Sequence, residues 1–361
     1  MGQLINAVTP LADARAVLAE HFDLKYSPAV ERETAEAYER VKNRIPGVEW
    51  PFFAPLIVEI NRLKRQKNAA ILAHNFQSPQ IFHGVADVTG DSLTLALAAA
   101  ELPQTVLVQA GVHFMAETTK VLNPGRTVLI PDSRAGCSLA GSITARDVRA
   151  MKATYPGVPV VAYMSSPAEV KVEADVCCTA GNALAVIEAM AGDAVILVPD
   201  EFLARNIARR TKKRVIAWAG ACEVHETFSA ADIAELRAAY PAAKILAHPE
   251  CPPEVVAAVD YSGSSDALVE WVKAEKPSRV VMVTECSISD NVAAETEGTE
   301  FVRGCNICPH MKRITLENIL WSLHTLTEEV TVAPEVIEPA AGAIRRMMEI
   351  ERKHSLQSRA G

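Results

Sequence analysis

The chain of 361 residues is predicted to be an α/β protein with parallel sheets, for three reasons. Short apolar runs alternate with Ala-, Leu- and Glu-rich stretches of helical length. The runs are apolar throughout, which is typical of parallel strands buried on both faces. The same arrangement of runs and turns also recurs along the chain. The runs lie at 69–73, 105–108, 127–130, 158–161, 194–198, 214–217, 244–247 and 279–283.

The recurring arrangement has a period of roughly 85 residues and occurs three times. Each copy has a strand ending in a polar cluster, a small-residue turn that opens a helix, two more strands and a cysteine. The clusters are His74-Asn75-Phe76, Tyr163-Met164-Ser165 and His248-Pro249-Glu250, the turns are Gly90-Asp91-Ser92, Thr179-Ala180-Gly181-Asn182 and Gly263-Ser264-Ser265, and the cysteines are Cys137, Cys222 and Cys308. The cysteines are 85 and 86 residues apart and the clusters 89 and 85. We therefore expect three similar α/β units related by a pseudo-threefold axis.

Both ends of the chain have a helical pattern outside the three copies. Before the first copy, helices are expected at 11–22, 34–44 and 54–66. The predicted organisation is a helical N-terminal extension at 1–68, α/β units at 69–155, 156–241 and 242–325, and a helical C-terminal tail at 326–361.

Composition and charge exclude several classes of protein. Hydrophobic residues make up 49% and charged residues 22% of the chain, which is enough apolar surface for a large core and too much for a disordered chain. The net charge is −8, and the basic cluster at 209–214 lies between two strand-like runs, where a solvated helix end explains it. A nucleic-acid binder is therefore not expected.

The sequence also predicts a cytoplasmic protein. Its apolar runs are far shorter than the ~18 residues of a membrane span. The N-terminus has no basic segment followed by an apolar one, as a signal peptide would. After Met1-Gly2, Asn6 stands where N-acylation needs Ser or Thr. Eight cysteines in such a chain favour reduced thiols with metal or catalytic roles over a disulfide framework.

The three copies predict one central site. Ligands of open parallel sheets bind beyond the carboxyl ends of the strands, so the strand-end clusters and Cys137, Cys222 and Cys308 are expected to converge there. Thiolates select zinc or an iron–sulfur cluster. A 4Fe-4S cluster on three cysteines leaves one iron open as a Lewis acid. The alternatives are a zinc ion, which usually takes a fourth protein ligand and paired CxxC motifs, and core thiols without metal.

The other cysteines have simpler interpretations. Cys305 and Cys308 form a CxxC pair, for which a redox role is the alternative to metal binding. Four more cysteines are interpreted as small buried residues at strand ends, namely Cys177, Cys178, Cys251 and Cys286.

Polar residues at the strand ends are candidates for proton transfer. His74 and His248 change charge near neutral pH, and Tyr163 could exchange a proton if its hydroxyl is desolvated. Glu250 follows His248 in a proline-flanked turn and could equally be a surface carboxylate, just as each histidine could be structural. The small-residue turns offer helix N-termini that suit phosphate or carboxylate, although a serine there can simply be an N-cap. These residues predict a Lewis-acid site for a small polyanion.

Seven motifs closely resemble those of the quinolinate synthase family. They occur in order from about residue 65 to residue 325 and form a specific set. The motifs are Leu72-Ala73-His74-Asn75-Phe76-Gln77, Gly90-Asp91-Ser92-Leu93, Gly111-Val112-His113-Phe114-Met115-Ala116-Glu117-Thr118, Ala135-Gly136-Cys137-Ser138-Leu139-Ala140, Cys222-Glu223-Val224-His225, Ala247-His248-Pro249-Glu250-Cys251 and Cys308-Pro309-His310-Met311-Lys312.

The resemblance implies three pseudo-symmetric α/β domains around a central 4Fe-4S cluster and an enzyme of de novo NAD biosynthesis. Such an enzyme condenses iminoaspartate (iminosuccinate) with dihydroxyacetone phosphate and releases phosphate and two waters to give quinolinate. An oxidase or dehydrogenase that produces iminoaspartate is then a candidate partner. The family's cluster ligands fall on Cys137, Cys222 and Cys308.

The resemblance also implies roles for the residues of the substrate site. His74, Tyr163, His248 and Glu250 are the expected catalytic residues, the last three as proton carriers. The helix N-termini at Ser92, Ala180 and Ser264 are expected to hold carboxylates or phosphate. The expected substrate contacts are His74, Asp91, Ser92, Tyr163, Ser165, Ala180, His248, Pro249, Glu250, Ser264 and Ser265.

The chain departs from the family pattern near this site. Phe76 replaces the usual Tyr, Ser165 the usual Asn and Ala180 the usual Ser, while Ser265 for Thr is milder. A lost charge-assisted hydrogen bond costs roughly 1.5–3 kcal/mol, which leaves room for a slow enzyme or a shifted substrate. The alternative hypothesis is a catalytically silent family member that binds a cluster as an iron or redox sensor. A zinc-bound hydrolase on the same scaffold is a third.

Overall fold

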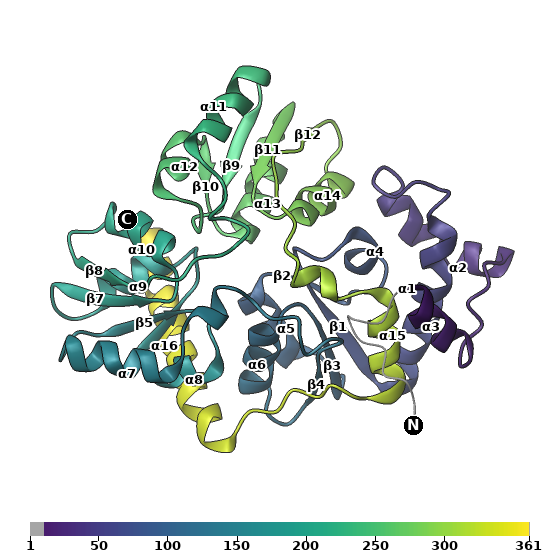
Figure 1. The fold of residues 1–361 in the computed structure, drawn as a ribbon, viewed down its shortest axis with the longest axis horizontal. Helices are drawn as coiled ribbons and strands as arrows, with labels where there is room; N and C mark the ends of the chain where they lie inside the picture. The colour runs from purple at the N-terminus through teal and green to yellow at the C-terminus, as the bar shows by residue number, and fades with distance from the viewer. Residues whose placement is uncertain (1–10, 361) are drawn as a thin grey trace. The chain divides into compact units, whose positions relative to one another are not determined.

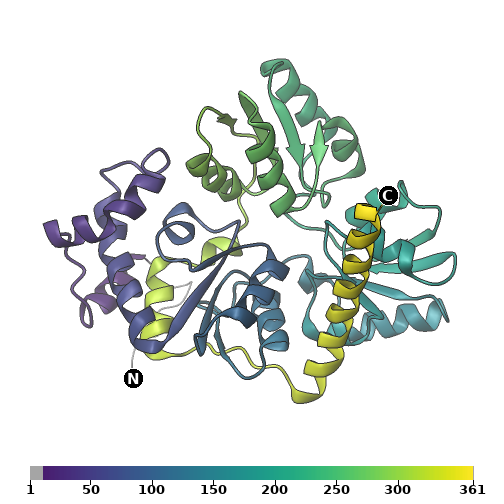
Figure 2. The ribbon, with the colours of Figure 1, turned by 180° about the vertical axis from the view of Figure 1, so that it is seen from behind.

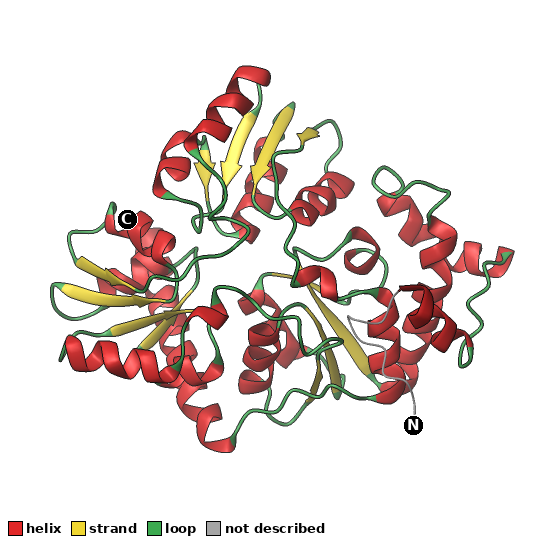
Figure 3. Ribbon diagram, viewed as in Figure 1, coloured by secondary structure: helices red, strands yellow, loops and turns green. Residues whose placement is uncertain are grey.

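The computed structural model describes the backbone of residues 11–360 and the side chains of residues 13–354. Helices surround three parallel four-stranded sheets (Figure 3), which confirms the predicted α/β class. Met1, Gly2 and Asn6, on which the predictions about a leader and acylation depend, lie outside the described residues. Among the helices that the structure describes, none is long and apolar enough to cross a membrane.

The chain divides into two compact units. Unit 1 comprises Met1–Gly136, Cys286–Gly298 and Ile307–Thr331, and unit 2 comprises Cys137–Glu285, Thr299–Asn306 and Val332–Gly361. One sheet belongs to unit 1 and two belong to unit 2. The predicted division into three α/β units with extensions remains a prediction.

All three sheets have the same strand order. The sheet of unit 1 runs β2 (Val88–Gly90), β1 (Ala69–His74), β3 (Val106–Ala110), β4 (Thr127–Leu129). The second runs β6 (Val176–Cys178), β5 (Val160–Tyr163), β7 (Ala194–Val198), β8 (Arg214–Ala217). The third runs β10 (Tyr261–Ser262), β9 (Lys244–Ala247), β11 (Arg279–Val283), β12 (Glu300–Val302). The registers include Ala69↔Val106, Val160↔Ile196 and Lys244↔Val280.

Each of the eight predicted runs contains or overlaps a strand. Four strands, β2, β6, β10 and β12, were not predicted. Each is only two or three residues long and lies at a sheet edge, where it pairs with a single neighbour. Runs that short carry too few residues for a hydrophobic pattern to be recognised.

Helices cover the sheets in both units. In unit 1, α3 and α15 lie on one side of the sheet and α5 and α6 on the other (Figure 1). The helices of unit 1 are α1 (Leu11–Ala19), α2 (Pro28–Val41), α3 (Trp50–Lys67), α4 (Pro79–Phe82), α5 (Ser92–Glu101), α6 (His113–Leu122), α14 (Cys286–Glu295) and α15 (Leu316–Thr325). Those of unit 2 are α7 (Ala145–Thr154), α8 (Ala168–Val172), α9 (Ala183–Ala189), α10 (Glu201–Ala208), α11 (Ala230–Ala239), α12 (Pro253–Ala258), α13 (Ser265–Glu275) and α16 (Pro334–Ala360).

The structure shows the internal repeat in the backbone hydrogen bonds of each sheet. An aspartate just before each short edge strand accepts a hydrogen bond from the backbone N–H of the neighbouring long strand. Asp87 accepts from Ile71 at 2.7 Å, Asp175 from Val160 at 2.7 Å and Asp260 from Ile245 at 2.8 Å. These aspartates are 88 and 85 residues apart, so the sequence period corresponds to one repeated local structure.

Capping boxes repeat with the same period. The N-cap residues of α7, α11 and α15 are Thr144, Ser229 and Thr315, and each exchanges hydrogen bonds with the residue three positions later. They are 85 and 86 residues apart, and each lies seven residues after Cys137, Cys222 or Cys308. Because a cap ends the preceding loop at a defined residue, the three cysteines occupy equivalent loop positions.

Helices make up most of the described residues of the N-terminal and C-terminal segments. In the N-terminal one, α3 buries Leu56, Ile57 and Ile60 in the core of unit 1. In unit 2, the C-terminal helix α16 lies along the second sheet (Figure 2) and packs against α8, β6 and α9. Arg346 of α16 donates to the carbonyl of Asp175 beside β6. The exposed basic segment at 209–214 follows α10, as expected of a solvated helix end.

Candidate active site

Polar residues gather at the carboxyl ends of the strands in unit 2. Tyr163 is the last residue of β5, His248 follows β9 directly, and Asp200 lies two residues after β7. All three are buried, as is Glu250 in the turn after His248. Buried polar groups need partners, so their hydrogen bonds define the site.

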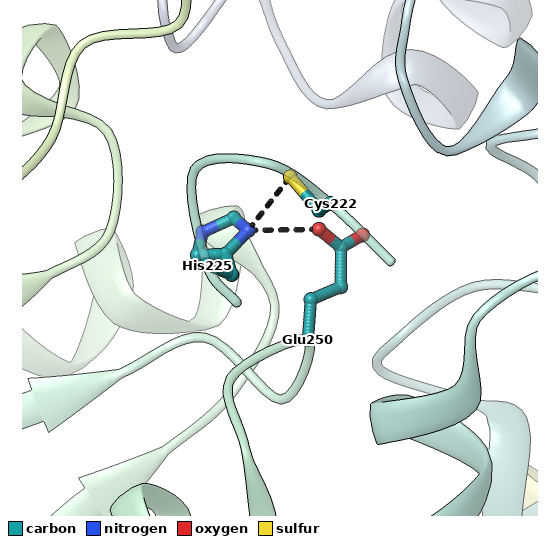
Figure 4. Close-up of side chains that lie close together, drawn as sticks. All are labelled: Cys222, His225 and Glu250. Atoms are coloured by element: carbon teal, nitrogen blue, oxygen red, sulfur yellow. Dashed lines mark hydrogen bonds and ion pairs between the residues drawn. The ribbon is translucent and has the colours of Figure 1, made fainter. Parts of the chain in front are cut away.

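Glu250 is the centre of this group. Its Oε1 accepts a 2.7 Å hydrogen bond from the Tyr163 hydroxyl, and its Oε2 lies 2.9 Å from Nδ1 of His225. Figure 4 shows the carboxylate pointing toward the imidazole of His225 and the thiol of Cys222. The side chain is only 8% exposed, so the alternative of a surface carboxylate is wrong.

His225 links the carboxylate to a cysteine. Its Nδ1 lies 3.2 Å from Sγ of Cys222, and its Nε2 lies 2.8 Å from Oγ1 of Thr284. Its ring stacks on that of His248, with centroids 4.7 Å apart. One potential ligand atom from each of Cys222, His225 and Glu250 lies within 4.8 Å of the other two. A thiol, an imidazole and a carboxylate are therefore close enough to contact the same bound atom.

The pKa values of the two buried carboxyl groups, Glu250 and Asp200, are shifted in opposite directions. Burial alone would raise the pKa of Glu250, but the charges of His248 and His225 outweigh burial and lower it. Burial and the neighbouring charge of Glu250 raise the pKa of Asp200 well above its usual value. Burial and Glu250 also raise the pKa of Tyr163. At neutral pH Glu250 is therefore ionised and Tyr163 holds its proton, while the pKa of Asp200 is shifted toward the protonated form.

Sequence reasoning missed two residues of this group. Asp200 could have been found from the sequence, because it follows a buried strand at the carboxyl end, where ligands bind. His225 had a weaker signal, since it lies three residues after Cys222 within a recognised motif. Its partners Glu250 and Thr284 lie far away in the chain, and only the folded structure brings them together.

Two of the three predicted metal ligands lie in unit 2. Cys137 and Cys222 are half-buried and belong to no disulfide, and the backbone N–H of Glu223 donates to Oγ of Ser138 at 3.0 Å, which joins their loops. Burial raises the pKa of the Cys222 thiol, and Glu250 and Cys137 raise it further. A bound cation would favour the thiolate there. Cys308 is also half-buried and outside any disulfide, and it belongs to unit 1.

The other cysteines partly differ from the predictions. Cys305 is disulfide-bonded and Cys308 is not, so the two do not form a redox disulfide with each other in this structure. Cys286 is half-buried at the start of α14 and is also disulfide-bonded, so its prediction as a buried thiol was wrong. Cys177 and Cys251 are buried as expected, as is Cys178, and burial raises the pKa of Cys177 to about 11.

Comparisons with known proteins match the whole region that contains these residues. Residues 58–349 match the family model described as "Quinolinate synthetase A protein". A protein of Caulobacter vibrioides named "Quinolinate synthase" is 55% identical over 344 residues, 94% of each chain. One of Sinorhizobium medicae with the same name is 53% identical over 340 residues, 94% of this chain and 95% of the relative. "Quinolinate synthase 1" of Mesorhizobium japonicum is 57% identical over 320 residues, 89% of this chain and 99% of the relative.

The chain belongs to the quinolinate synthetase A family. This confirms the resemblance found in the motifs and assigns the chain to a family of enzymes. The substrate contacts that the resemblance implied can now be located one by one in the structure.

His74 of this family member adopts the same local structure as His248. It ends β1 and is buried, and its Nδ1 accepts a 3.2 Å hydrogen bond from the backbone N–H of Phe76. In the other loop, Nδ1 of His248 accepts from the N–H of Glu250 at 3.3 Å. The neutral form of each ring therefore has its proton on Nε2. The ring of Phe76 meets His74 edge-on, with centroids 4.7 Å apart.

The three small-residue turns differ in how far they resemble anion sites. Ser92 begins α5, but the carboxylate of its N-cap Asp91 already accepts from the N–H groups of Leu93 and Thr94 at 3.1 and 2.9 Å. Asp91 thus caps the helix. In the third turn, Ser264 caps α13, which begins at the buried Ser265.

The second turn does not match its prediction. Helix α9 begins at Ala183, so Ala180 lies three residues before it and not at the helix N-terminus. The intervening turn is closed by Asn182, whose Oδ1 accepts from the N–H of Thr179 at 2.7 Å and whose Nδ2 donates to Glu351 at 3.1 Å. The sequence signal was misleading because a Thr–Asn side-chain turn and a helix start use the same residue types.

Ser165 and Pro249 lie in the loops that carry the central group. Ser165 is half-buried, two residues after Tyr163, and its hydrogen bond to that tyrosine slightly offsets the rise of the tyrosine pKa. The carbonyl of Pro249 accepts a hydrogen bond from Asn206. That these residues contact substrate remains a prediction.

Proposed function

We propose that this chain condenses iminoaspartate with dihydroxyacetone phosphate to form quinolinate, phosphate and two waters in NAD biosynthesis, in the cytoplasm. Membership of the family and the names of the relatives support this reaction. The observation that carries the proposal is the buried group formed by Glu250, Tyr163, His225 and His248 next to the free thiol of Cys222.

The proposal includes a 4Fe-4S cluster held by Cys137, Cys222 and Cys308, with three α/β units around it. Three half-buried cysteines that form no disulfide lie at equivalent positions of the repeat, which supports that assignment. Their soft sulfur donors suit an iron–sulfur cluster. When bound, such a cluster supplies a Lewis-acid position for the dehydration steps.

The residues around Glu250 supply the proton transfers. Ring formation requires protons to be taken from carbon and delivered to leaving hydroxide. The imidazoles of His225 and His248 lie beside the Glu250 carboxylate and are the groups assigned to carry these protons. Tyr163 keeps its proton and can donate a hydrogen bond, because burial and Glu250 raise its pKa. Glu250 stays ionised, orients the tyrosine hydroxyl and the His225 imidazole, and stabilises an imidazolium when one forms.

Binding of the anionic substrates is assigned to the turns at the strand ends. The N-terminus of α13, capped by Ser264, and the Ser92 end of α5 place backbone dipoles toward carboxylate or phosphate. Asp91 neutralises part of that dipole, so we expect the α13 turn to contribute more to anion binding.

The test is quinolinate formation by protein purified without oxygen and supplied with both substrates. We expect turnover by the wild-type chain and a loss of roughly 100-fold or more in Glu250→Gln, because charge and orientation at the proton-transfer group are removed. Glu254→Gln is the matched control, since Glu254 is an exposed carboxylate on α12 and should have no effect. A cluster-loaded wild-type protein that makes no quinolinate would contradict the proposal and favour the silent iron or redox sensor.

A further inference from the structure

The side chain of Asn206 holds the loop that carries Glu250. Asn206 lies on α10 and is buried. Its Nδ2 donates to the carbonyl of Pro249 at 2.9 Å and to that of Cys251 at 2.9 Å. These are the residues immediately before and after Glu250, so one carboxamide orients the peptide groups on both sides of it.

The same contact occurs a second time, in unit 1. Asn291 of α14 is buried, and its Nδ2 donates to the carbonyls of Asn75 at 3.1 Å and Gln77 at 2.8 Å. The acceptors lie one and three residues after His74, just as Pro249 and Cys251 lie one and three residues after His248. Asn206 and Asn291 are 85 residues apart, the period of the repeat. The paired hydrogen bonds are therefore a feature of the repeated structure.

The loop after β9 depends on this contact more than an ordinary turn would. Pro249, Pro252 and Pro253 have no backbone N–H, so the loop can make few hydrogen bonds of its own. Within it, the N–H of Cys251 donates to the carbonyl of His248 at 3.0 Å. Without Asn206, the carbonyls of Pro249 and Cys251 would lose their partner in a buried place, which favours movement of the loop.

The repeat does not require an asparagine at every strand end. The loop after β5, which follows Tyr163, is held by the buried Lys171, whose ammonium donates to the carbonyl of Ser166. The carboxamide thus accompanies the two strand ends that carry a histidine, and of these two loops only the one held by Asn206 also carries a carboxylate.

We propose that Asn206 is a positioning residue for Glu250, and through it for the hydrogen bond to Tyr163 and the contact with His225. This inference rests on the proposed function, because it gives the position of Glu250 a catalytic consequence. Misplacing a catalytic group by about 1 Å can cost roughly 100-fold in rate. We expect Asn206→Ala to lower kcat about 10- to 100-fold and to change KM less than about threefold.

A double-mutant cycle distinguishes positioning from general stabilisation. In a Glu250→Asp background, where the carboxylate is already displaced, Asn206→Ala should lower kcat by less than about threefold more. Asn291→Ala is the matched control, because it removes the same pair of hydrogen bonds from a loop that has Phe76 in place of the carboxylate. The fold-loss in kcat of the Asn291→Ala, Glu250→Asp double variant should equal the product of the losses of the two single variants. If the fold-loss in kcat of the Asn206→Ala, Glu250→Asp double variant also equals the product of the two single losses, the inference is overturned.

Hydrogen–deuterium exchange provides a readout that needs no turnover. Asn206→Ala should speed exchange in the segment 248–257 and leave 74–78 unchanged, and Asn291→Ala should do the reverse. Asn206→Ser retains one donor and serves if the alanine variant does not fold. If the wild-type chain makes no quinolinate but the exchange pattern is found, the proposed function fails and the loop contact stands. Unchanged exchange at 248–257 overturns the inference whatever the activity.

Discussion

At the scale of single residues, the site contains two buried carboxyl groups whose pKa values are shifted in opposite directions. Glu250 is surrounded by His225, His248 and the hydroxyl of Tyr163, so its charge is compensated. Asp200 receives a hydrogen bond from the N–H of Leu203 on Oδ1, while its buried Oδ2 has no partner among the described residues. The ionised form is therefore favoured in one case and penalised in the other.

The state of Asp200 predicts a pH-dependent effect on stability. Its pKa is raised in the folded chain, so folding retains a proton that the unfolded chain releases above about pH 4. The stability of the wild type therefore falls as pH rises from the unfolded toward the folded pKa. Asp200→Asn removes this dependence, so its melting temperature relative to wild type should increase between pH 5 and pH 8. Thermal melts across that range measure it.

An exposed carboxylate provides the control for this prediction. Asp193→Asn, in the exposed turn before β7, should keep a constant difference from wild type across the same pH range. If the difference between Asp200→Asn and wild type is equally constant, Asp200 is ionised in the folded chain and the interpretation is wrong.

At the scale of elements, each copy of the repeat ends one loop and starts one helix at a defined residue. The capping boxes of α7, α11 and α15 start these helices seven residues after the predicted ligand cysteines. The asparagines of α10 and α14 then hold the strand-end loops. Local hydrogen bonds therefore determine where each loop begins and ends, and the candidate site residues lie within these loops.

The cap of α7 can be tested by a pair of threonine substitutions in one helix. Thr144→Ala removes the capping box with Asp147 and should lower the free energy of unfolding by about 1 kcal/mol. Thr154 lies at the other end of α7, where its hydroxyl only donates back to the carbonyl of Ala150 at 3.0 Å. Thr154→Ala should therefore be close to neutral. Urea unfolding of both variants measures the difference, and equal effects would show that the box adds nothing.

At the scale of the whole molecule, segments that follow the second and third sheets in sequence belong to the same unit as the first sheet. Unit 1 includes α14 and α15 from the last quarter of the chain, and α15 packs against α3 of the N-terminal extension. Unit 1 also contains Cys308, while Cys137 and Cys222 belong to unit 2. The proposed cluster therefore takes its ligands from distant parts of the sequence.

This proposal predicts that each of the three thiols is needed for the metal. Cys137→Ser, Cys222→Ser and Cys308→Ser should each lose most of the bound iron and sulfide, because a hydroxyl is a poor ligand for a soft metal site. Cys177→Ser is the control, since Cys177 is a buried thiol of β6 outside this set. Iron and sulfide per chain are measured after anaerobic purification. Full iron content in any one of the three variants removes that cysteine from the ligand set.

The sequence alone determined the class of fold, the long strands, the repeat and the family. These depend on local patterns, namely apolar runs, turn residues and motif spacing, which are present in the chain before it folds. The capping boxes were not predicted, but they follow the cysteine period because both belong to the same repeated loop. The short edge strands and the start of α9 were missed, since they depend on one neighbouring strand or on a side-chain turn.

Only the tertiary structure decided how the site residues act. The sequence left Glu250 open as a surface carboxylate, whereas in the structure it is buried, and its contacts with His225, His248 and Tyr163 keep it ionised in spite of burial. The contributions of Asp200 and Asn206 likewise arise from contacts with residues more than 40 positions away. A pKa depends on burial and on neighbouring charges, and a loop position on distant hydrogen bonds, and neither is encoded in the residues next to it in sequence.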